Sequence, residues 1–471
     1  MRFVQRWAIG LICFMSLFGL MSCGGGSTSS SNTDLSAAEI TRNASNIEAL
    51  PNPFVLNDPL FEHQWSLRNN GQVALTRSGF GGFAGADITT FANADVSAQS
   101  YADGVYGRGV TIGILDDGLD SAHQDLSPNV LIDGSYDFKL RSATGDAASL
   151  SGKHGTSVAG LAAARGGNGI GIWGAAPLAK LQGFNFLTNG EFDAERASLG
   201  SDQARQIYPG LRSDLTMVFN KSYGENPDIV PEPGSNSDSI VKEVMTIMQQ
   251  QTETGRNGLG AVYVKAGGNE FKGGNVFSAY WCREAISEGI TCYNVNQETE
   301  NNTPFQMVVG AFNAQGLRSS YSNTGSSLWL VAPGGELGEQ QPALVSTDQS
   351  GCAQGLSLSS GFVEPNTLFN LGQTDSNQNC DYYSAFNGSS AATPLVSGTA
   401  ALLLEAYPQA SWRDIKHFLA MTARKLQANL SPITRNVNGQ TVTLEQGWVT
   451  NAAGIDFSNG YGFGAVSVVD A

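Results

Sequence analysis

The chain has 471 residues, of which 41% are hydrophobic and only 14% are charged, and it contains 57 glycines. This composition is typical of a loop-rich α/β or β protein and excludes a coiled coil or a long helical bundle. The formal net charge of −16 becomes −18 when the two arginines of residues 1–23, a segment without acids, are removed. Such a negative field repels phosphate backbones, so we expect no nucleic-acid partner.

The first 23 residues resemble the signal peptide of a bacterial lipoprotein. Arg2 and Arg6 precede an apolar run over residues 7–20, which is too short to cross a bilayer as a mature helix. The run ends in the letters LMSC, where Cys23 matches the cysteine of a lipobox. The resemblance implies that Cys23 is diacylated and anchors the protein to a membrane. An ordinary secretory signal that happens to contain a cysteine is the alternative.

Residues 24–56 form a polar segment rich in Gly, Ser and Asn, which we interpret as a flexible tether. Residues 57–471 have a globular pattern without a repeat or a second linker, which predicts one domain. Because Gly24 is not Asp, we expect an outer-membrane location if the cell is Gram-negative. More generally, the signal predicts a lipid-anchored protein of the cell envelope or a secreted protein.

The pattern of residues 110–423 alternates between two kinds of segment. We expect strands at residues 110–115, 216–220, 261–265, 306–312 and 328–332, and helices at 157–164, 239–251, 391–406 and 412–423. Strands that alternate with helices predict an α/β fold with a mostly parallel central sheet and helices on both faces. Functional residues of such sheets gather at the carboxyl ends of the strands, where Asp116 and Asn269 fall.

Six cysteines occur, and two of them belong to the signal segment. The other four permit three disulfide connectivities. Proximity in the sequence favours Cys282–Cys292 and Cys352–Cys380, and an oxidising compartment would allow both bonds to form. A zinc site is the competing interpretation, but the four cysteines show no C-x-x-C spacing.

Four histidines are available to act as a catalytic base: His63, His123, His154 and His417. His417 belongs to a predicted amphipathic helix, and His63 and His123 are flanked by ordinary polar loop residues. His154 opens the stretch HGTSVAG, whose small residues allow a helix to begin close to other backbone. If the protein uses a nucleophile with a histidine base, His154 is therefore the candidate.

Three further side chains could complete such a site, although each also has a purely structural interpretation. Asp116, after a buried strand, could orient an imidazole, or it could be part of an ordinary Asp-Asp-Gly turn. Asn269 follows a strand and two glycines and could donate an amide to an oxyanion. Ser390 lies at the start of a predicted helix, where free N–H groups stabilise negative charge, although serine is also common as a helix cap.

Taken together, these segments resemble the subtilase family of serine peptidases. The blocks DDG at residues 116–118, HGTSVAG at 154–160, AGGN at 266–269 and GSSAATP at 388–394 occur in the family order. The stretches NDPLF at 57–61, LLLEA at 402–406 and GYGFG at 460–464 are similar to the kexin/furin-like branch. The resemblance covers residues 57–471 and implies a three-layer subtilisin-like fold.

The resemblance implies a serine endopeptidase that hydrolyses peptide bonds through an acyl-enzyme. Ser390 would be the nucleophile, His154 the general base and then acid, and Asp116 the group that orients His154. Asn269 and the backbone N–H of Ser390 would form the oxyanion hole. The residue before the nucleophile is usually Thr in the family, and here Ser389 lacks one methyl group, a conservative change that we expect to preserve activity.

Specificity is less clear from the motifs. In kexin-like enzymes, acidic side chains of the primary pocket select a basic substrate residue, but residues 224–228 and 292–294 do not carry those acids in register. Asp117 matches a residue that reads a basic side chain upstream of the cleaved bond, so a preference for basic sites stays an expectation. The net charge adds little to such a preference because salt screens it.

The same resemblance implies a structural calcium ion between an acidic residue and the loop of residues 165–172. Carboxylate, amide and carbonyl oxygens are the ligands that Ca²⁺ prefers. The implied ligands are Asp125, Arg165, Asn168, Ile170 and Ile172. Residues 169–174 also match G-x-G-x-x-G, but this motif follows a helix and not a strand, so we reject a dinucleotide site.

The expected partners are protein or peptide substrates and a membrane reached through the anchor at Cys23. Too little chain lies between Cys23 and residue 57 for the usual folded propeptide, so folding would need no chaperone or a separate one. Two other classes of function have less support, a non-catalytic binding module and a hydrolase of another family. A non-catalytic subtilase-fold binding module has no chemical reason to keep all four site residues, and a lipase or metallopeptidase lacks its G-x-S-x-G or H-E-x-x-H motif.

Overall fold

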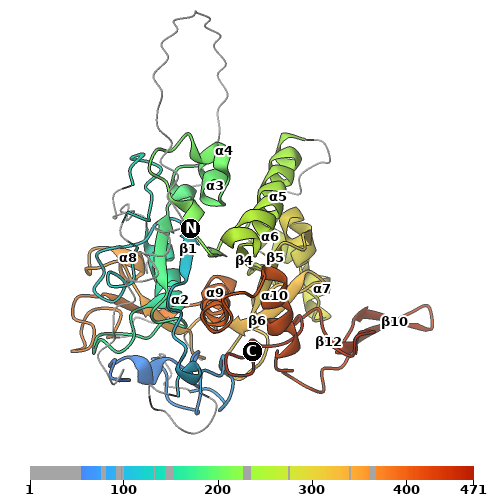
Figure 1. The fold of residues 1–471 in the computed structure, drawn as a ribbon. Helices are drawn as coiled ribbons and strands as arrows, with labels where there is room; N and C mark the ends of the chain where they lie inside the picture. Colours follow the sequence, from blue (N-terminus) through green and yellow to red (C-terminus); the bar gives the residue numbers. More distant parts are fainter. Residues whose placement is uncertain are drawn as a thin grey trace, which may run out of the picture. The chain divides into compact units, whose positions relative to one another are not determined.

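A parallel sheet of six strands forms the centre of the part of the protein that the structure describes (Figure 1). The structure is a computed structural model that describes residues 55–75, 81–91, 97, 100–131, 133–143, 152–225, 235–273, 276–338, 341–359 and 368–471. All of these belong to the second of two units of the chain, Glu48–Ala471. The signal segment, Cys23 and most of the predicted tether lie outside the described residues.

The six strands follow the order β2-β1-β3-β4-β5-β6, and each neighbouring pair is parallel. This order places β1 beside β3, and β3 beside β4, so that their carboxyl ends share one edge of the sheet. The strands are β1 (Thr111–Leu115), β2 (Lys180–Phe184), β3 (Val218–Lys221), β4 (Val262–Ala266), β5 (Gln306–Phe312) and β6 (Leu328–Pro333).

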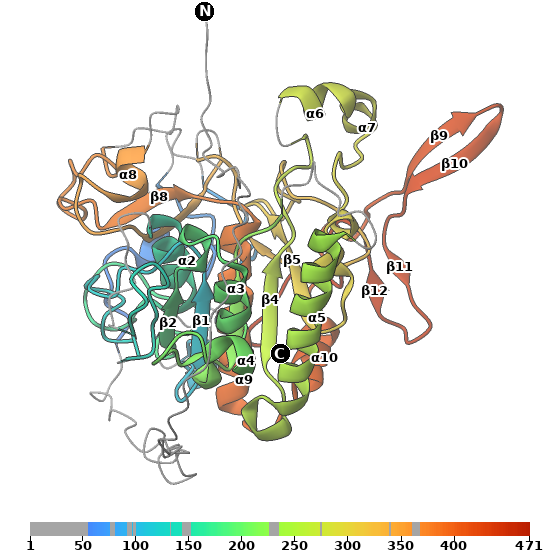
Figure 2. The same ribbon diagram turned by 90° about the horizontal axis from the view of Figure 1, so that it is seen from above.

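Helices cover both faces of this sheet (Figure 2). On one face, apolar side chains of α2, α9 and α10 pack on the strands in one hydrophobic core, and on the other face α3, α4 and α5 pack on a second core. The described α-helices are α2 (Lys153–Ala163), α3 (Phe192–Ser198), α4 (Asp202–Arg205), α5 (Asn236–Thr254), α6 (Val276–Trp281), α7 (Arg283–Ser287), α8 (Gly355–Ser359), α9 (Ser389–Ala406) and α10 (Trp412–Met421). The predicted three-layer α/β fold is therefore confirmed.

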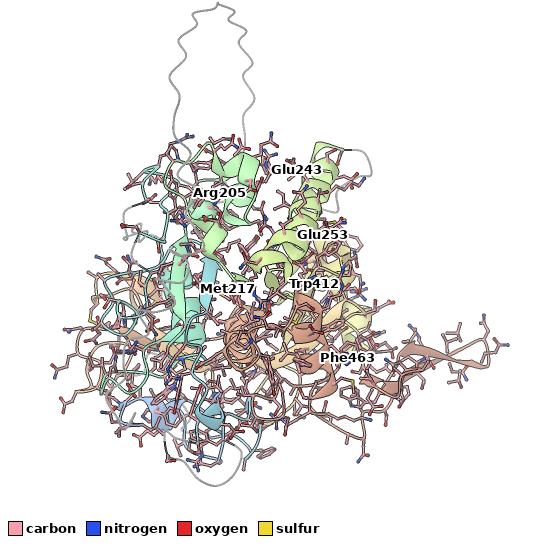
Figure 3. The ribbon with its side chains drawn as sticks, in the orientation of Figure 1. Arg205, Met217, Glu243, Glu253, Trp412 and Phe463 are labelled. Carbon is pink, nitrogen blue, oxygen red and sulfur yellow. A yellow bond between two sulfur atoms is a disulfide. The ribbon has the colours of Figure 1, made fainter. Side chains whose placement is uncertain are left out.

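The helix contacts explain why small residues dominate α2 and α9. A Cβ on Gly398 of α9 would lie 3.0 Å from the carbonyl oxygen of Ala162 in α2. The two helices pack closely because glycine and alanine fill this seam. Trp412, labelled in Figure 3, begins α10. Its backbone N–H donates to the carbonyl oxygen of Leu259 at 2.9 Å, which ties the start of α10 to the turn after α5.

Three antiparallel strand pairs and two disulfides complete the described structure. The second disulfide, Cys352–Cys380, ties the long connection between β7 and β8, and Cys282–Cys292 joins the α6–α7 region to the following loop. Both predicted pairings are confirmed. The β9–β10 hairpin extends away from the sheet (Figure 1). The remaining strands are β7 (Leu344–Thr347), β8 (Tyr382–Phe386), β9 (Ile433–Val437), β10 (Gln440–Glu445), β11 (Val449–Thr450) and β12 (Asp456–Phe457).

The expected strands and helices occur within a few residues of their predicted bounds, with two consequences for function. Helix α2 begins at Lys153 and not at Ser157, so His154 lies in its first turn. Strand β2 has no counterpart in the expectations, because its sequence KLQGF contains a buried glutamine and a glycine. This strand pairs with β1 and thereby buries the end of β1 where Asp116 follows.

Candidate active site

Asp116 directly follows β1 and is almost completely buried, with 1% of the residue exposed. Its backbone N–H donates to the carbonyl oxygen of Phe184 at 3.1 Å, which continues the pairing of β1 with β2. Burial of a carboxylate is unfavourable unless hydrogen bonds or an opposite charge compensate it. The N–H of Asp117 donates to Oδ1 at 2.8 Å, and His154 lies on the other side.

His154 contacts both carboxylate oxygens of Asp116. Its Nδ1 lies 2.9 Å from Oδ1 and 3.0 Å from Oδ2. Because a carboxylate only accepts hydrogen bonds, the imidazole carries its proton on Nδ1, and Nε2 of the neutral ring is free to accept a proton. The ring of Phe386 packs edge-on against the imidazole with 5.4 Å between centroids. The side chain of His154 remains 34% exposed, so a substrate or nucleophile has access to it.

Gly155 allows α2 to begin this close to β1. A Cβ at this position would lie 2.0 Å from the carbonyl oxygen of Gly118 and 2.9 Å from Cβ of Asp116. Any side chain here would therefore push the helix, and with it His154, away from Asp116. The contact confirms the expectation that small residues let this helix start against other backbone.

Asp117 binds the exposed start of α2 with both carboxylate oxygens. The backbone N–H of Gly155 donates to Oδ1 at 2.8 Å, and that of His154 donates to Oδ2 at 3.2 Å. The first N–H groups of a helix have no partner within the helix, and a carboxylate stabilises them. Asp117 thus fixes the backbone that carries His154, a contact that the sequence did not indicate. Its predicted contact with a substrate residue stays a prediction.

The charges of the two aspartates change the titration of His154. Burial alone lowers the pKa of His154, but the charge and hydrogen bond of Asp116, together with the charge of Asp117, raise the pKa to about 9. Burial and the charge of Asp116 raise the pKa of Asp117 to about 7 against the opposing charge of His154 and the two N–H donors. The imidazole is therefore protonated over a wider pH range than an isolated histidine.

Ser390 lies in the first turn of α9 and faces the end of β3. Its hydroxyl donates to the carbonyl oxygen of Ser222 at 3.1 Å, and the hydroxyl of Ser222 donates to the carbonyl oxygen of Ser390 at 3.0 Å. Within the described part of the chain, the Ser390 hydroxyl is thus bonded to Ser222 and not to His154. At this helix start, the N–H groups of Ala391 and Ala392 donate to the carbonyl oxygen of Gly388, whereas the N–H of Ser390 has no partner among the described residues and is left to bind an anion.

Asn269 follows β4 and is held in one orientation by Ser389. Its Oδ1 accepts from the backbone N–H of Ser389 at 2.8 Å and from the Ser389 hydroxyl at 3.1 Å. The Ser389 hydroxyl in turn accepts from the N–H of Gly268 at 3.0 Å. With Oδ1 occupied, the Nδ2 amide of Asn269 is the group left to donate to a ligand. In the sequence, Ser389 is a conservative replacement of the usual Thr. In the structure, the Ser389 hydroxyl positions the side chain of Asn269.

A cavity of about 110 Å³ opens beside Ser390 and Asn269. One wall is the segment after β3 and the opposite wall is the segment after β4, and residues before β5 form its far side. Three carboxylates contribute to the lining of the cavity, although residues 224–228 and 292–294 do not carry acids in register with those of kexin-like enzymes. These are Glu225, Glu270 and Glu298. Residues 226–228 of the expected segment lie outside the described residues.

The predicted calcium ligands lie around the loop after α2, together with a carboxylate that sequence reasoning missed. Oδ1 of Asp125 accepts from Nδ2 of Asn168, and its Oδ2 accepts from the N–H of Ile172, both at 2.9 Å. Asp58 accepts from the N–H groups of Gly167 at 2.7 Å and of Asn168 at 3.3 Å. The motif NDPLF, which contains Asp58, was the available signal.

Both carboxylates are buried, and the partners just given are neutral N–H groups. Burial raises the pKa of Asp125 to about 8 and that of Asp58 to about 6. Two buried acids beside the Asn168 side-chain amide provide oxygen ligands of the kind that a hard cation such as Ca²⁺ prefers. Among the described residues, no three His, Cys, Asp or Glu side chains cluster as a metal site. The two remaining predicted ligands, Arg165 and Ile170, belong to the same loop, and the N–H of Ile170 donates to Oδ1 of Asn168.

In the part of the chain that the structure describes, no helix is long and apolar enough to cross a membrane.

Comparisons with known proteins relate the chain to one family. The model of the subtilase family matches residues 107–464. An extracellular serine protease of Aeromonas sobria is 36% identical over 420 residues, which cover 87% of this chain and 63% of that protein. Kexin of Saccharomyces cerevisiae is 28% identical over 411 residues, covering 87% of this chain and 39% of kexin.

A solved structure gives the same relationship. The crystal structure of the A. sobria serine protease in complex with a chaperone aligns with a TM-score of 0.72 and 34% identity, covering 88% of this chain and 66% of that one. The chain thus spans about three fifths of the length of the Aeromonas relatives it matches.

Proposed function

This chain belongs to the subtilase family, and we propose that it is a serine endopeptidase whose catalytic residues are Asp116, His154 and Ser390. The observation that carries the proposal is the pair of hydrogen bonds between Asp116 and Nδ1 of His154, which leaves Nε2 as a base at the edge of the sheet that also holds Ser390. Asn269 and the N–H of Ser390 would serve as the oxyanion hole.

In this mechanism the Ser390 hydroxyl turns from the carbonyl of Ser222 to Nε2 of His154. His154 takes the hydroxyl proton while Oγ attacks the substrate carbonyl, and Asp116 stabilises the imidazolium. Nδ2 of Asn269 and the N–H of Ser390 bind the oxyanion. His154 then protonates the leaving amine, an acyl-enzyme forms on Ser390, and a water molecule activated by His154 hydrolyses it.

A fluorophosphonate probe tests this proposal directly, because it labels only an activated serine. We expect label on Ser390 of the wild-type protein, located by peptide mass mapping, and none on a Ser390→Ala variant. Folded wild-type protein that takes no label and cleaves no peptide would refute the peptidase and favour the binding-module alternative.

We further propose that the substrates carry a basic residue before the cleaved bond. The support is the acidic lining of the cavity beside Ser390, since the side chain next to the attacked carbonyl must enter the space that adjoins the nucleophile and the oxyanion hole. Cleavage-site profiling on a peptide library checks this: cleavage after neutral and acidic residues as often as after Arg and Lys would contradict it.

We also propose that Asp58 and Asp125 hold a structural Ca²⁺ with Asn168 and backbone carbonyls of the loop at residues 165–172. The bound ion would supply positive charge to two buried carboxylates and fix the loop. Isothermal titration of the purified protein with CaCl₂ should show binding that an Asp125→Asn variant loses. Equal binding by both proteins would exclude this site.

We propose that the protein is attached to the cell envelope through Cys23 or is secreted. We also propose that a separate chaperone assists its folding. The relatives support secretion and a chaperone: one is named an extracellular serine protease, and one solved structure of an A. sobria serine protease is a complex with a chaperone. Metabolic labelling with a palmitate analogue tests the anchor, since a Cys23→Ala variant should lose the label. Refolding of the purified chain to a fluorophosphonate-reactive state without any added protein would refute the need for a chaperone.

A further inference from the structure

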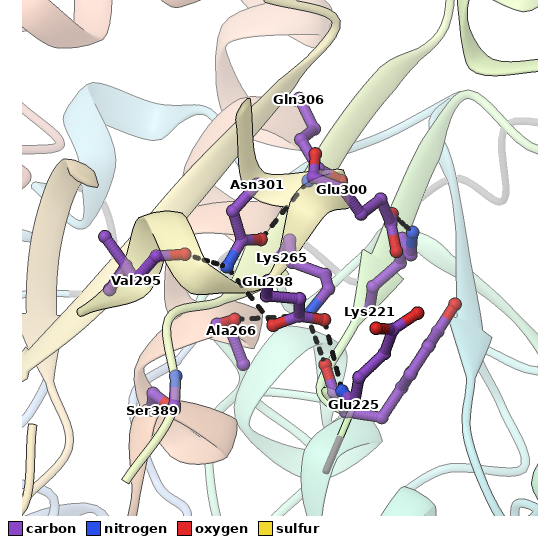
Figure 4. Close-up of polar contacts among 12 residues, drawn as sticks. Lys221, Glu225, Lys265, Ala266, Val295, Glu298, Glu300, Asn301, Gln306 and Ser389 are labelled. Atoms are coloured by element: carbon purple, nitrogen blue, oxygen red, sulfur yellow. Dashed lines mark hydrogen bonds and ion pairs between the residues drawn. The ribbon is translucent and has the colours of Figure 1, made fainter. Parts of the chain in front are cut away.

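The cavity beside Ser390 has a buried lysine directly behind its wall. Lys265, near the end of β4, has a completely buried side chain. Its ammonium group donates to the carbonyl oxygen of Tyr223 at 2.7 Å and forms an ion pair with Glu298 at 2.8 Å (Figure 4). Both Tyr223 and Glu298 line the cavity, so the lysine neutralises one of the acids that a substrate would meet.

Glu298 is held in place on each side. The N–H of Glu225 donates to its Oε1 at 3.2 Å, and Nδ2 of Asn301 donates to its Oε2 at 3.2 Å. A Cβ on Gly224 would lie 3.3 Å from Oε2 of Glu298 and 3.6 Å from Nζ of Lys265. The ion pair between Lys265 and Glu298 therefore lies against the backbone of the cavity wall. At this distance its charges act on a substrate side chain that is bound in the cavity.

A second ion pair lies deeper, between Lys221 at the end of β3 and Glu300. Each buried lysine thus has its own glutamate, as Figure 4 shows. Glu225 differs from both glutamates, because its side chain forms no hydrogen bond or ion pair with the described residues. This exposed carboxylate is free to meet a substrate cation. The third carboxylate of the cavity, Glu270, accepts hydrogen bonds from Asn269 and Asn323 but forms no ion pair with the described residues, so it also lacks a cationic partner.

Resting on the proposed peptidase function, we propose that Lys265 is a specificity-determining residue that cancels the charge of Glu298. As a result, the cavity recognises a cationic P1 side chain, the one next to the cleaved bond, through Glu225 and Glu270. A cavity without this lysine would present three uncompensated carboxylates to the same side chain. The lysine therefore limits how strongly the enzyme prefers a charged P1 residue over a neutral one.

The test compares two peptide substrates that differ only in P1, with arginine in one and its uncharged isostere citrulline in the other. Lys265→Met removes the resident cation and leaves Glu298 without a cationic partner, so a substrate cation gains a further counter-ion. We expect the arginine-to-citrulline ratio of kcat/KM to rise about tenfold, the size of effect that a close charge pair produces.

Glu298→Gln has the opposite effect, because Lys265 then has no carboxylate partner and repels a cationic P1 side chain. The same ratio should fall about tenfold. The double variant Lys265→Met/Glu298→Gln removes both charges and should return the ratio to within about threefold of wild type, since near-isosteric neutral replacements cancel together. Lys242→Met, which removes an exposed lysine of α5, is the matched control and should leave the ratio unchanged.

Ratios that stay within twofold of wild type in either single variant, while fluorophosphonate still labels it, would overturn the role of Lys265. If Lys265→Met does not fold, the fall predicted for Glu298→Gln decides the proposal by itself. Failure of the peptidase proposal looks different, because the wild-type protein would then take no label and turn over neither peptide.

Discussion

The hydroxyl of Ser389 provides the most sensitive test of the site geometry, because it acts on catalysis only through Asn269. Ser389→Ala removes two hydrogen bonds, the one to Oδ1 of Asn269 at 3.1 Å and the one from the N–H of Gly268 at 3.0 Å. Ser389 is completely buried, so no water replaces them. At about 0.5–1.5 kcal/mol per bond, the free energy of unfolding should fall by about 1–3 kcal/mol.

The effect on catalysis depends on the hydrogen bond that Asn269 keeps in the variant. Oδ1 of Asn269 keeps its bond from the N–H of Ser389 at 2.8 Å, so the side chain stays near its position but is held by one donor and not two. A complete oxyanion donor contributes about 2.7–4 kcal/mol to the transition state. If half of that is lost, kcat falls about 10- to 30-fold while KM changes little. Steady-state hydrolysis of a chromogenic peptide measures both constants.

Two companion variants distinguish positioning from a general loss of structure. Ser389→Thr keeps the hydroxyl and should retain at least about a fifth of the wild-type kcat, because we expect the added methyl group to cost less than about 1 kcal/mol of transition-state stabilisation. In an Asn269→Ala background, Ser389→Ala should lower kcat by less than about twofold, since its target is absent. A wild-type kcat for Ser389→Ala, or the same fall in both backgrounds, would refute the reasoning.

Three further predictions concern pH, metal and disulfide. The negative charge of Asp117 contributes to raising the pKa of His154, which reaches about 9. Asp117→Asn should therefore lower this pKa, and the neutral base is then present at lower pH. As a result, the ascending limb of the kcat/KM profile should shift toward acid. A limb that stays in place or moves toward alkali would contradict this. Removal of Ca²⁺ with EDTA should lower the Tm of the wild-type protein but not that of Asp125→Asn, as differential scanning fluorimetry would show; equal shifts in both would contradict the site. The double replacement of Cys352 and Cys380 by Ser should lower the free energy of unfolding by about 2–4 kcal/mol in urea titrations, and no change would mean that this bond does not stabilise the fold.

Much of the architecture follows from local patterns. Strands β4 and β5 are runs of β-branched and apolar residues, and α9 is a long run of small apolar residues, so their positions are readable one segment at a time. The catalytic candidates are readable for a related reason, because Asp116 and Asn269 directly follow such strands and His154 and Ser390 begin such helices. Short-range pattern and motif order together suffice for these four residues.

Strand β2 shows the limit of this approach. Its residues Gln182 and Gly183 have little intrinsic preference for a strand, and their conformation results from pairing with β1. The oxygen of the Gln182 side chain accepts from the Thr216 hydroxyl, and its amide nitrogen donates to two backbone carbonyls. These partners satisfy a polar group that the sequence alone marks as unsuited to a core.

The sequence by itself indicated five of the six strands of the central sheet, the helices α2, α5, α9 and α10 and the two disulfide pairs, because these depend on residue type and short spacing, and the order of the motifs indicated the four candidate catalytic residues through their resemblance to one family. Only the tertiary structure decided which distant side chains meet: Asp58 with the loop beside Asp125, Ser389 with Asn269, and Lys265 with Glu298 behind the cavity wall. These contacts join segments that lie far apart in the sequence, and they result from packing over the whole core and not from any local pattern.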